Sequence, residues 1–104
     1  MRPRWLAALL GVAACGAGAQ GSADTNARVL AATCAACHGT DGRAIEGASV
    51  AGLAGMPKDQ MLAQLQAFRS GARPATIMHQ LAKGYSDAQI EQLATWFAAQ
   101  KKER

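Results

Sequence analysis

Hydrophobic residues near the end of the chain recur at the spacing of one face of an α-helix. This apolar stripe consists of Ile90, Leu93, Ala94 and Phe97. Charged residues lie off the stripe or at its end, as in a helix that buries one face. No segment of the chain shows the alternation of apolar and polar residues that is typical of a half-buried strand. The pattern therefore predicts an all-α fold.

The start of this helix is marked by its capping residues. Ser86 and Gln89 have the spacing of a capping box. Tyr85 and Ile90 occupy the positions of a hydrophobic staple. A short helix is also predicted between residues 74 and 84, because two apolar residues lie one turn apart there between a proline and a glycine.

A longer helix is predicted between Pro57 and Gly71. Proline suits the first turn of a helix, and glycine suits its C-terminal cap. Three apolar residues between them recur at i, i+4 and i+7, namely Met61, Leu65 and Phe68. This spacing indicates a second buried helical face.

The first helix is expected ahead of two cysteines. Asp24 or Thr25 can cap it, and it runs towards Thr33. Glycines then recur over residues 39–56, which predicts a closely packed loop rather than a regular element. A loop of this length is a candidate for function.

The N-terminal segment has the layout of a secretory signal peptide. Arg2 and Arg4 precede an apolar run over residues 5–14, which is too short to span a bilayer as a helix. An A-x-A cleavage site follows. We therefore expect a signal peptide over residues 1–19 and one exported, periplasmic domain over residues 20–104.

A second interpretation of the same segment stays open. Val12-Ala13-Ala14-Cys15 resembles a lipobox. In that case the signal would cover residues 1–14, and Cys15 would carry the acyl chains that anchor a lipoprotein to the membrane.

The charge of the chain excludes one class of partner. The formal net charge is +4, from 11 Lys and Arg against 7 Asp and Glu. Removal of residues 1–19 would take away Arg2 and Arg4 and leave nine against seven, or +2. The remaining positive charges are scattered, with no basic stripe among aromatics, so we expect no nucleic-acid partner.

Large side chains are scarce in the predicted domain. Its aromatic residues are Phe68, Tyr85, Trp96 and Phe97. A domain of this size with so many alanines buries too little apolar surface to be stable by itself. We therefore expect a bound group to complete the interior.

The cysteines indicate which group this is. Residues 34–38 read Cys-Ala-Ala-Cys-His, the C-x-x-C-H signature of haem attachment in c-type cytochromes. Cys34 and Cys37, three positions apart, can each form a thioether to one vinyl group of a single porphyrin. His38 then places an imidazole under the iron. The motif predicts one covalent haem c.

Three other interpretations of the motif compete. A zinc site would need a second pair of ligands, but the only other histidine is His79 and no cysteine follows Cys37. A thioredoxin-like C-x-x-C needs a βαβ setting, which the helical pattern does not offer. A structural disulfide is compatible with export, yet it leaves His38 and the sparse core without explanation.

A haem iron needs a sixth ligand or an open site. The candidates are Met56, Met61, Met78 and His79. Met61 belongs to a helical apolar stripe, where methionine is more often a filler of the core. Met56 lies in a loop. His79 would point about 100° away from Met78 on a helix, so the two cannot both reach the iron.

Three blocks of sequence carry a resemblance to a known family. They are Cys34 to Gly42, Gly71 to Met78, and Ala82 to Asp87. They resemble the class I cytochromes c and, more narrowly, the cytochrome subunit of flavocytochrome c sulfide dehydrogenase. The similarity extends over about residues 27–99. It implies a small helical fold in which the first and last helices cross and the loops wrap one haem.

The resemblance also implies roles for individual residues. His38 would be the fifth ligand of the iron and Met78 the sixth. In related sequences a loop that matches residues 49–53 contains a proline, and its backbone carbonyl is associated with the second ring nitrogen of the histidine. This chain has no proline there, which leaves the geometry of that hydrogen bond in question.

The expected function is electron transfer without substrate chemistry on this chain, so no catalytic residue is assigned. The resemblance implies an FAD-containing flavoprotein partner that oxidises sulfide, and a soluble cytochrome or an oxidase as electron acceptor. A free periplasmic carrier is the alternative. A sensor with an open haem site is disfavoured by the assignment of Met78.

Overall fold

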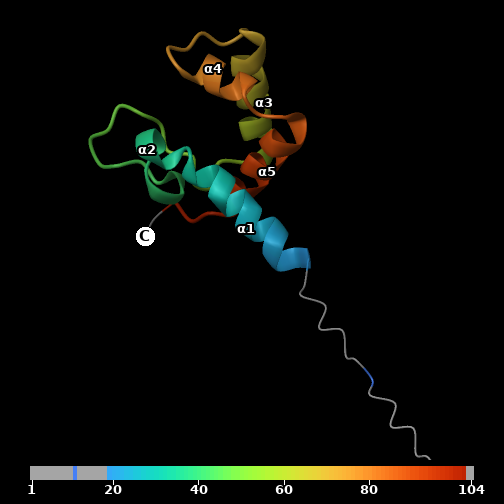
Figure 1. The fold of residues 1–104 in the computed structure, drawn as a ribbon. Coiled ribbons are helices and arrows are strands. Elements are labelled where there is room, and N and C mark those ends of the chain that lie inside the picture. Colours follow the sequence, from blue (N-terminus) through green and yellow to red (C-terminus); the bar gives the residue numbers. More distant parts are fainter. Residues whose placement is uncertain (1–10, 12–18, 103–104) are drawn as a thin grey trace, which may run out of the picture.

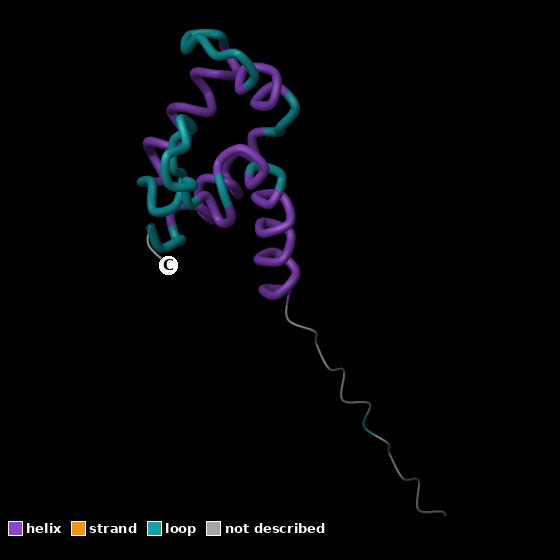
Figure 2. Tube along the Cα trace, turned by 90° about the vertical axis from the view of Figure 1, so that its left-hand side faces the viewer, coloured by secondary structure: helices purple, strands orange, loops and turns teal. Residues whose placement is uncertain are grey.

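The computed structural model describes Gly11 and residues 19–102. Within these residues the regular structure is helical, without a strand, which confirms the predicted all-α fold (Figures 1 and 2). The elements are α1 (Ala19–Ala32), α2 (Ala35–His38), the 3-10 turn η1 (Thr40–Gly42), α3 (Lys58–Ser70), α4 (Met78–Lys83) and α5 (Asp87–Ala98).

The predictions on the N-terminal segment concern residues that are largely outside this range. The signal peptide over residues 1–19 and the lipid anchor at Cys15 therefore stay predictions. Over the described positions, none of the helices combines the length and the hydropathy that a membrane crossing requires.

The last helix, α5, lies at the centre of the fold. Both α1 and α3 pack against it, and α4 packs against α3 (Figure 1). The first and last helices are thus in contact, as the resemblance implied. In Figure 1 the connection between α2 and α3 lies at the left of the molecule and the connection between α3 and α4 at the top.

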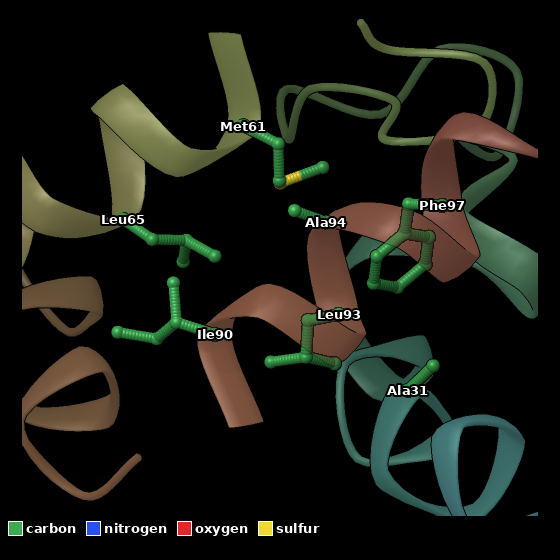
Figure 3. Packing of buried hydrophobic residues seen from close by; sticks show 7 residues of the cluster. All are labelled: Ala31, Met61, Leu65, Ile90, Leu93, Ala94 and Phe97. Carbon is green, nitrogen blue, oxygen red and sulfur yellow. The ribbon is translucent and has the colours of Figure 1, made fainter. Parts of the chain in front are cut away.

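The core forms where α1, α3 and α5 meet (Figure 3). Its buried side chains are Ala31, Met61, Leu65, Ile90, Leu93, Ala94 and Phe97. The predicted stripe of α5 supplies four of these residues, none more than 2% exposed. Two alanines among seven residues leave this core small, as the composition indicated.

The helix ends follow local sequence signals at most positions. Both hydrogen bonds of the capping box at Ser86 and Gln89 are present. Gly71 ends α3 in the left-handed conformation, with a φ of 84°. Pro57 is the N-cap residue of α3 rather than part of its first turn, and α4 begins only at Met78.

The predicted start of the first helix is wrong. This helix begins at Ala19, so Asp24 and Thr25 lie inside it and neither is its N-cap. Residues 19–23 read Ala-Gln-Gly-Ser-Ala, so the helix continues through a glycine of low helix propensity. A residue type that can cap a helix does not by itself determine where the helix begins. Its end at Ala32 agrees with the prediction.

Candidate functional site

A cavity of 430 Å³ lies beside the core. Leu65, Leu93 and Phe97 belong to the core and also line this cavity. The cavity is therefore continuous with the interior, and a group bound in it would extend the apolar core.

The C-x-x-C-H motif forms one wall of the cavity. The chain leaves α1 at Ala32, and Cys34 is the N-cap residue of α2, which ends at His38. Cys34, Cys37 and His38 all line the cavity. The sequence predicted the motif at the end of the first helix, whereas it occupies a separate helical turn.

Alternative uses of the motif find no support in the geometry. Both cysteines are free thiols rather than partners in a disulfide. Across the part of the chain that the structure describes, no group of three or more His, Cys, Asp or Glu side chains could hold a metal ion. A zinc site therefore has no ligand set there.

His38 is oriented by a hydrogen bond to the main chain. Its Nδ1 lies 2.7 Å from the carbonyl oxygen of Ala51. A carbonyl can only accept, so Nδ1 carries the hydrogen and Nε2 keeps its lone pair. This is the tautomer that a metal-binding imidazole needs. The expected hydrogen bond forms although residues 49–53 lack the proline found in related sequences.

The loop that carries Ala51 is fixed at its base. The Gly42 carbonyl accepts hydrogen bonds from the Leu53 and Ala54 N–H groups, at 2.7 and 3.0 Å. Gly42 is buried, and a Cβ atom added to it would lie 2.8 Å from the Phe97 ring. The core thus holds the loop that holds the histidine.

A second contact fixes the same loop from outside. Arg43 Nε donates to the Lys101 carbonyl at 2.9 Å, and its Nη1 donates to the Asp41 carboxylate at 3.2 Å. The bond to Lys101 ties the residue after Gly42 to the segment that follows α5. Sequence reasoning did not identify Arg43, because its partner is a main-chain group 58 residues away.

Three of the four candidate sixth ligands reach the cavity. Met56, Met61 and Met78 line it, whereas His79 does not. Met61 is only 3% exposed and belongs to the core, which agrees with its role as filler. The Nδ1 of His79 is buried without a hydrogen-bond partner among the described residues.

Thr33 and Tyr85 join the segment after α1 to the segment before α5, beside Cys34. The Thr33 hydroxyl donates to the Leu30 carbonyl at 2.7 Å, so in its contact with Tyr85, at 3.0 Å, the tyrosine hydroxyl donates. Both residues line the cavity. Burial raises the pKa of the Cys34 thiol above its ordinary value.

These residues fit a haem c. Two thiols and a correctly oriented imidazole lie on one wall, and methionine sulfurs are present in the same cavity. The remaining lining is mostly apolar, as a porphyrin face requires. The macrocycle could be held on one side by Cys34, Cys37 and His38. On the other side, Met56 or Met78 could supply the sixth ligand of the iron.

Comparisons with known proteins agree with this site. The family described as cytochrome c oxidase, cbb3-type, subunit III matches residues 21–97. The chain is 41% identical over 71 residues to a thiosulfate dehydrogenase electron acceptor of Thiomonas intermedia, which covers 68% of this chain and 33% of that protein. It is 31% identical over 74 residues to a cytochrome subunit of sulfide dehydrogenase of Chlorobaculum tepidum, covering 71% and 66%.

A third relative is cytochrome c-554(548) of Halomonas halodenitrificans, which is 33% identical over 72 residues that make up 86% of its length. The chain thus matches most of one small cytochrome but only about a third of the Thiomonas protein. The match to the Chlorobaculum protein confirms the narrower resemblance to cytochrome subunits of sulfide dehydrogenases.

The family match covers most of the chain, and the relatives share the c-type cytochrome character that the motif predicted. A covalently bound haem c and a function in electron transfer follow from this membership. The chain belongs to the class I c-type cytochromes, in the family described as cytochrome c oxidase, cbb3-type, subunit III.

Proposed function

We propose that this chain is the monohaem electron-transfer subunit of a periplasmic dehydrogenase that oxidises sulfide with a flavin. One observation carries the assignment of the haem site: a single apolar cavity brings together Cys34, Cys37, His38 and Met78. The relative named as the cytochrome subunit of a sulfide dehydrogenase supports the choice of complex.

The two cysteines would hold the haem covalently. Each thiol would add across one vinyl group, so that sulfur bonds to one vinyl carbon and the hydrogen passes to the other. Cys34 is half-buried and Cys37 exposed, so Cys37 stands at the outer side of the cavity wall. The bound haem supplies one-electron chemistry by cycling between ferric and ferrous iron.

His38 would bind the iron through Nε2. The hydrogen bond from Nδ1 to the Ala51 carbonyl fixes the plane of the ring and leaves the Nε2 lone pair available. Because the acceptor is a backbone group on a loop closed at Gly42, the orientation of the imidazole does not depend on a mobile side chain.

We assign the sixth ligand to Met78 rather than Met56. Met56 donates its N–H to the Leu53 carbonyl, and Leu53 is bonded in turn to Gly42. It therefore belongs to the segment that holds His38. Met78 begins α4, which Figure 1 shows apart from α2. Ligation by histidine and methionine favours a high reduction potential and electron transfer.

Paired substitutions test this assignment. Met78→Ala should abolish the weak sulfur-to-iron charge-transfer band of the oxidised protein and lower its reduction potential, because the iron loses a thioether ligand. Met56→Ala, which removes a methionine from the same cavity, should leave the band in place. The reverse result would transfer the role of sixth ligand to Met56.

The partner can be tested separately. A tagged chain should copurify with a flavin-containing protein, and sulfide should reduce the haem in that complex. A chain that elutes alone with a full complement of haem would contradict a permanent subunit.

A second function is favoured by the Thiomonas relative, which is named as the electron acceptor of a thiosulfate dehydrogenase. As a free carrier, this chain would accept electrons from such a dehydrogenase and pass them to a soluble cytochrome or an oxidase. Reduction of the isolated chain by a thiosulfate dehydrogenase, but not by a sulfide-oxidising flavoprotein, would favour this alternative.

Export to the periplasm, with cleavage after residue 19, is part of the proposal. The alternative anchor at Cys15 has a direct test. Growth with a radioactive fatty acid should leave the mature protein unlabelled if cleavage follows residue 19, whereas a label that is lost in Cys15→Ser would identify a lipoprotein.

A further inference from the structure

One residue with a permanent formal charge, Arg73, lines the cavity. The other titratable groups there are those of the C-x-x-C-H motif and Tyr85. Among the residues that line the cavity, Arg73 is the only arginine or lysine, and no aspartate or glutamate is present. The neutral polar side chains of Gln64 and Thr76 come from the same side of the domain, on α3 and on the connection to α4.

The guanidinium of Arg73 is held in place without an acidic partner. It lies over the ring of Phe68, 4.7 Å from the ring centroid, and Phe68 lines the cavity as well. The Arg73 N–H donates to the Ala67 carbonyl at 3.0 Å, which fixes the backbone at the end of α3. The ion pairs seen within residues 19–102 involve Arg43, Lys58 and Arg69 instead.

Arg73 is exposed to solvent while it also lines this apolar cavity, so its guanidinium is available to an anionic group of a ligand bound there. Moving a carboxylate from water to an apolar site costs free energy unless an opposite charge pairs with it. The planar guanidinium group of arginine binds a carboxylate through two parallel hydrogen bonds. Haem c has two propionate carboxylates on the edge of the porphyrin opposite its vinyl groups.

We propose that Arg73 binds a haem propionate and thereby fixes the direction in which the haem lies in the cavity. The proposal rests on the proposed function, because it requires a haem in this cavity. The cysteines hold the vinyl edge at α2. The propionate edge then points to the connection between α3 and α4, the loop at the top of Figure 1.

The stacking on Phe68 prepares the guanidinium for this role. It limits the positions that the side chain takes before the ligand arrives, so less conformational entropy is lost on binding. Gln64 and Thr76 can donate further hydrogen bonds to the carboxylates from the same side.

The reduction potential gives the first test, on the haem-bearing protein. A cation beside a propionate disfavours the additional positive charge of ferric iron, so Arg73→Gln should lower the potential. Arg28→Gln is the matched control, because Arg28 is exposed, as Arg73 is, but lies on α1 and does not line the cavity. The reduction potential should shift clearly less in Arg28→Gln than in Arg73→Gln. The potential of Arg73→Lys should lie between those of the wild type and Arg73→Gln.

Nuclear magnetic resonance of the reduced wild-type protein gives a second test that needs no variant. Arg73 Nε–H should exchange with solvent more slowly than Arg28 Nε–H and should show a nuclear Overhauser effect to a propionate methylene. Equal shifts of the potential in Arg73→Gln and Arg28→Gln, or a freely exchanging Arg73 without that contact, would overturn the role of Arg73 while the haem assignment stands. A chain that carries no covalent haem would overturn the proposed function itself.

Discussion

The two sides of the cavity are built in different ways. Residues 33–56, here called the proximal side, contain short helical turns and a loop held by directed hydrogen bonds, with the Gly42 carbonyl and His38 Nδ1 at their centre. Residues 57–85, the distal side, are mostly α3 and α4, and α3 packs its apolar face on α5.

This difference corresponds to what each side has to do. An imidazole must present one nitrogen in one direction, which hydrogen bonds of fixed geometry achieve. A methionine and a flat macrocycle need a surface of suitable shape, which apolar packing supplies. On the proximal side, main-chain hydrogen bonds therefore set the orientation of the imidazole. On the distal side, packed side chains set the shape of the surface that receives the macrocycle.

The largest loss of stability is expected from Gly42→Ala, on the proximal side. The φ of Gly42 is 76°, and a Cβ atom would lie 2.8 Å from Phe97 and 3.0 Å from the Ala54 nitrogen. Left-handed strain costs about 1–3 kcal/mol and overpacking adds roughly 1–3 kcal/mol. Denaturant unfolding of the haem-bearing protein measures this loss.

Gly47→Ala is the control for this substitution. Its φ is 78°, yet nothing lies within 4 Å of an added Cβ atom. It should cost only the backbone strain, on the order of 1–2 kcal/mol. Equal losses in the two variants would show that the contact between the loop and the core contributes nothing.

Leu65→Ala tests the packing of the distal side. Leu65 is 7% exposed and contacts both the core and the cavity. Its truncation should lower the free energy of unfolding by roughly 2–5 kcal/mol, because it leaves a void among α3, α5 and the haem. Unlike Gly42→Ala, it should leave the exchange rate of the His38 Nδ1–H unchanged.

Ser86→Ala tests the joint between α4 and α5. The Ser86 hydroxyl accepts from the Gln89 N–H at 3.1 Å, and the Gln89 side chain accepts from the Ser86 N–H at 2.9 Å. Loss of the cap should cost about 1 kcal/mol. Ser49→Ala, in the exposed proximal loop, should change unfolding little, and an equal effect of both would contradict the role of the cap.

The smallest effect is expected from Asp87→Asn. The hydrogen bond from Arg69, and then the charge of Arg69, hold the pKa of the Asp87 carboxyl below its ordinary value. A lowered pKa contributes stability above the unfolded pKa, about 4, and that contribution is lost as the pH falls through the folded pKa. Acid titration of unfolding should therefore be slightly steeper for wild type than for the variant.

Much of the helical scaffold could be predicted from local signals. The cap at Ser86, the stripe of α5 and the terminal Gly71 each depend on residues within a few positions of one another. The start of α1 could not be predicted, because the helix continues N-terminally past Asp24 through a glycine and a serine that local signals would place outside it. Alanine-rich sequence leaves that boundary undetermined.

The haem site was predictable in part for a related reason. The contiguous motif predicted Cys34, Cys37 and His38 as haem-binding residues, and all three line one cavity. The methionine ligand could not be chosen by spacing, since Met56 and Met78 both reach the same cavity. The role proposed for Arg73 could not be read from the sequence, because it depends on Arg73 being the one basic residue among the cavity-lining residues, which come from distant segments.

The hydrogen bond from Arg43 to residue 101 does not depend on which side chain that residue carries. Arg43 donates to a main-chain carbonyl, so any residue at position 101 offers the same acceptor. Evolution can therefore vary the side chain at position 101 freely, whereas a chain cut after Gln100 would lose the bond. In engineering, the Lys101 side chain is a suitable point for a label, and the backbone there has to be kept.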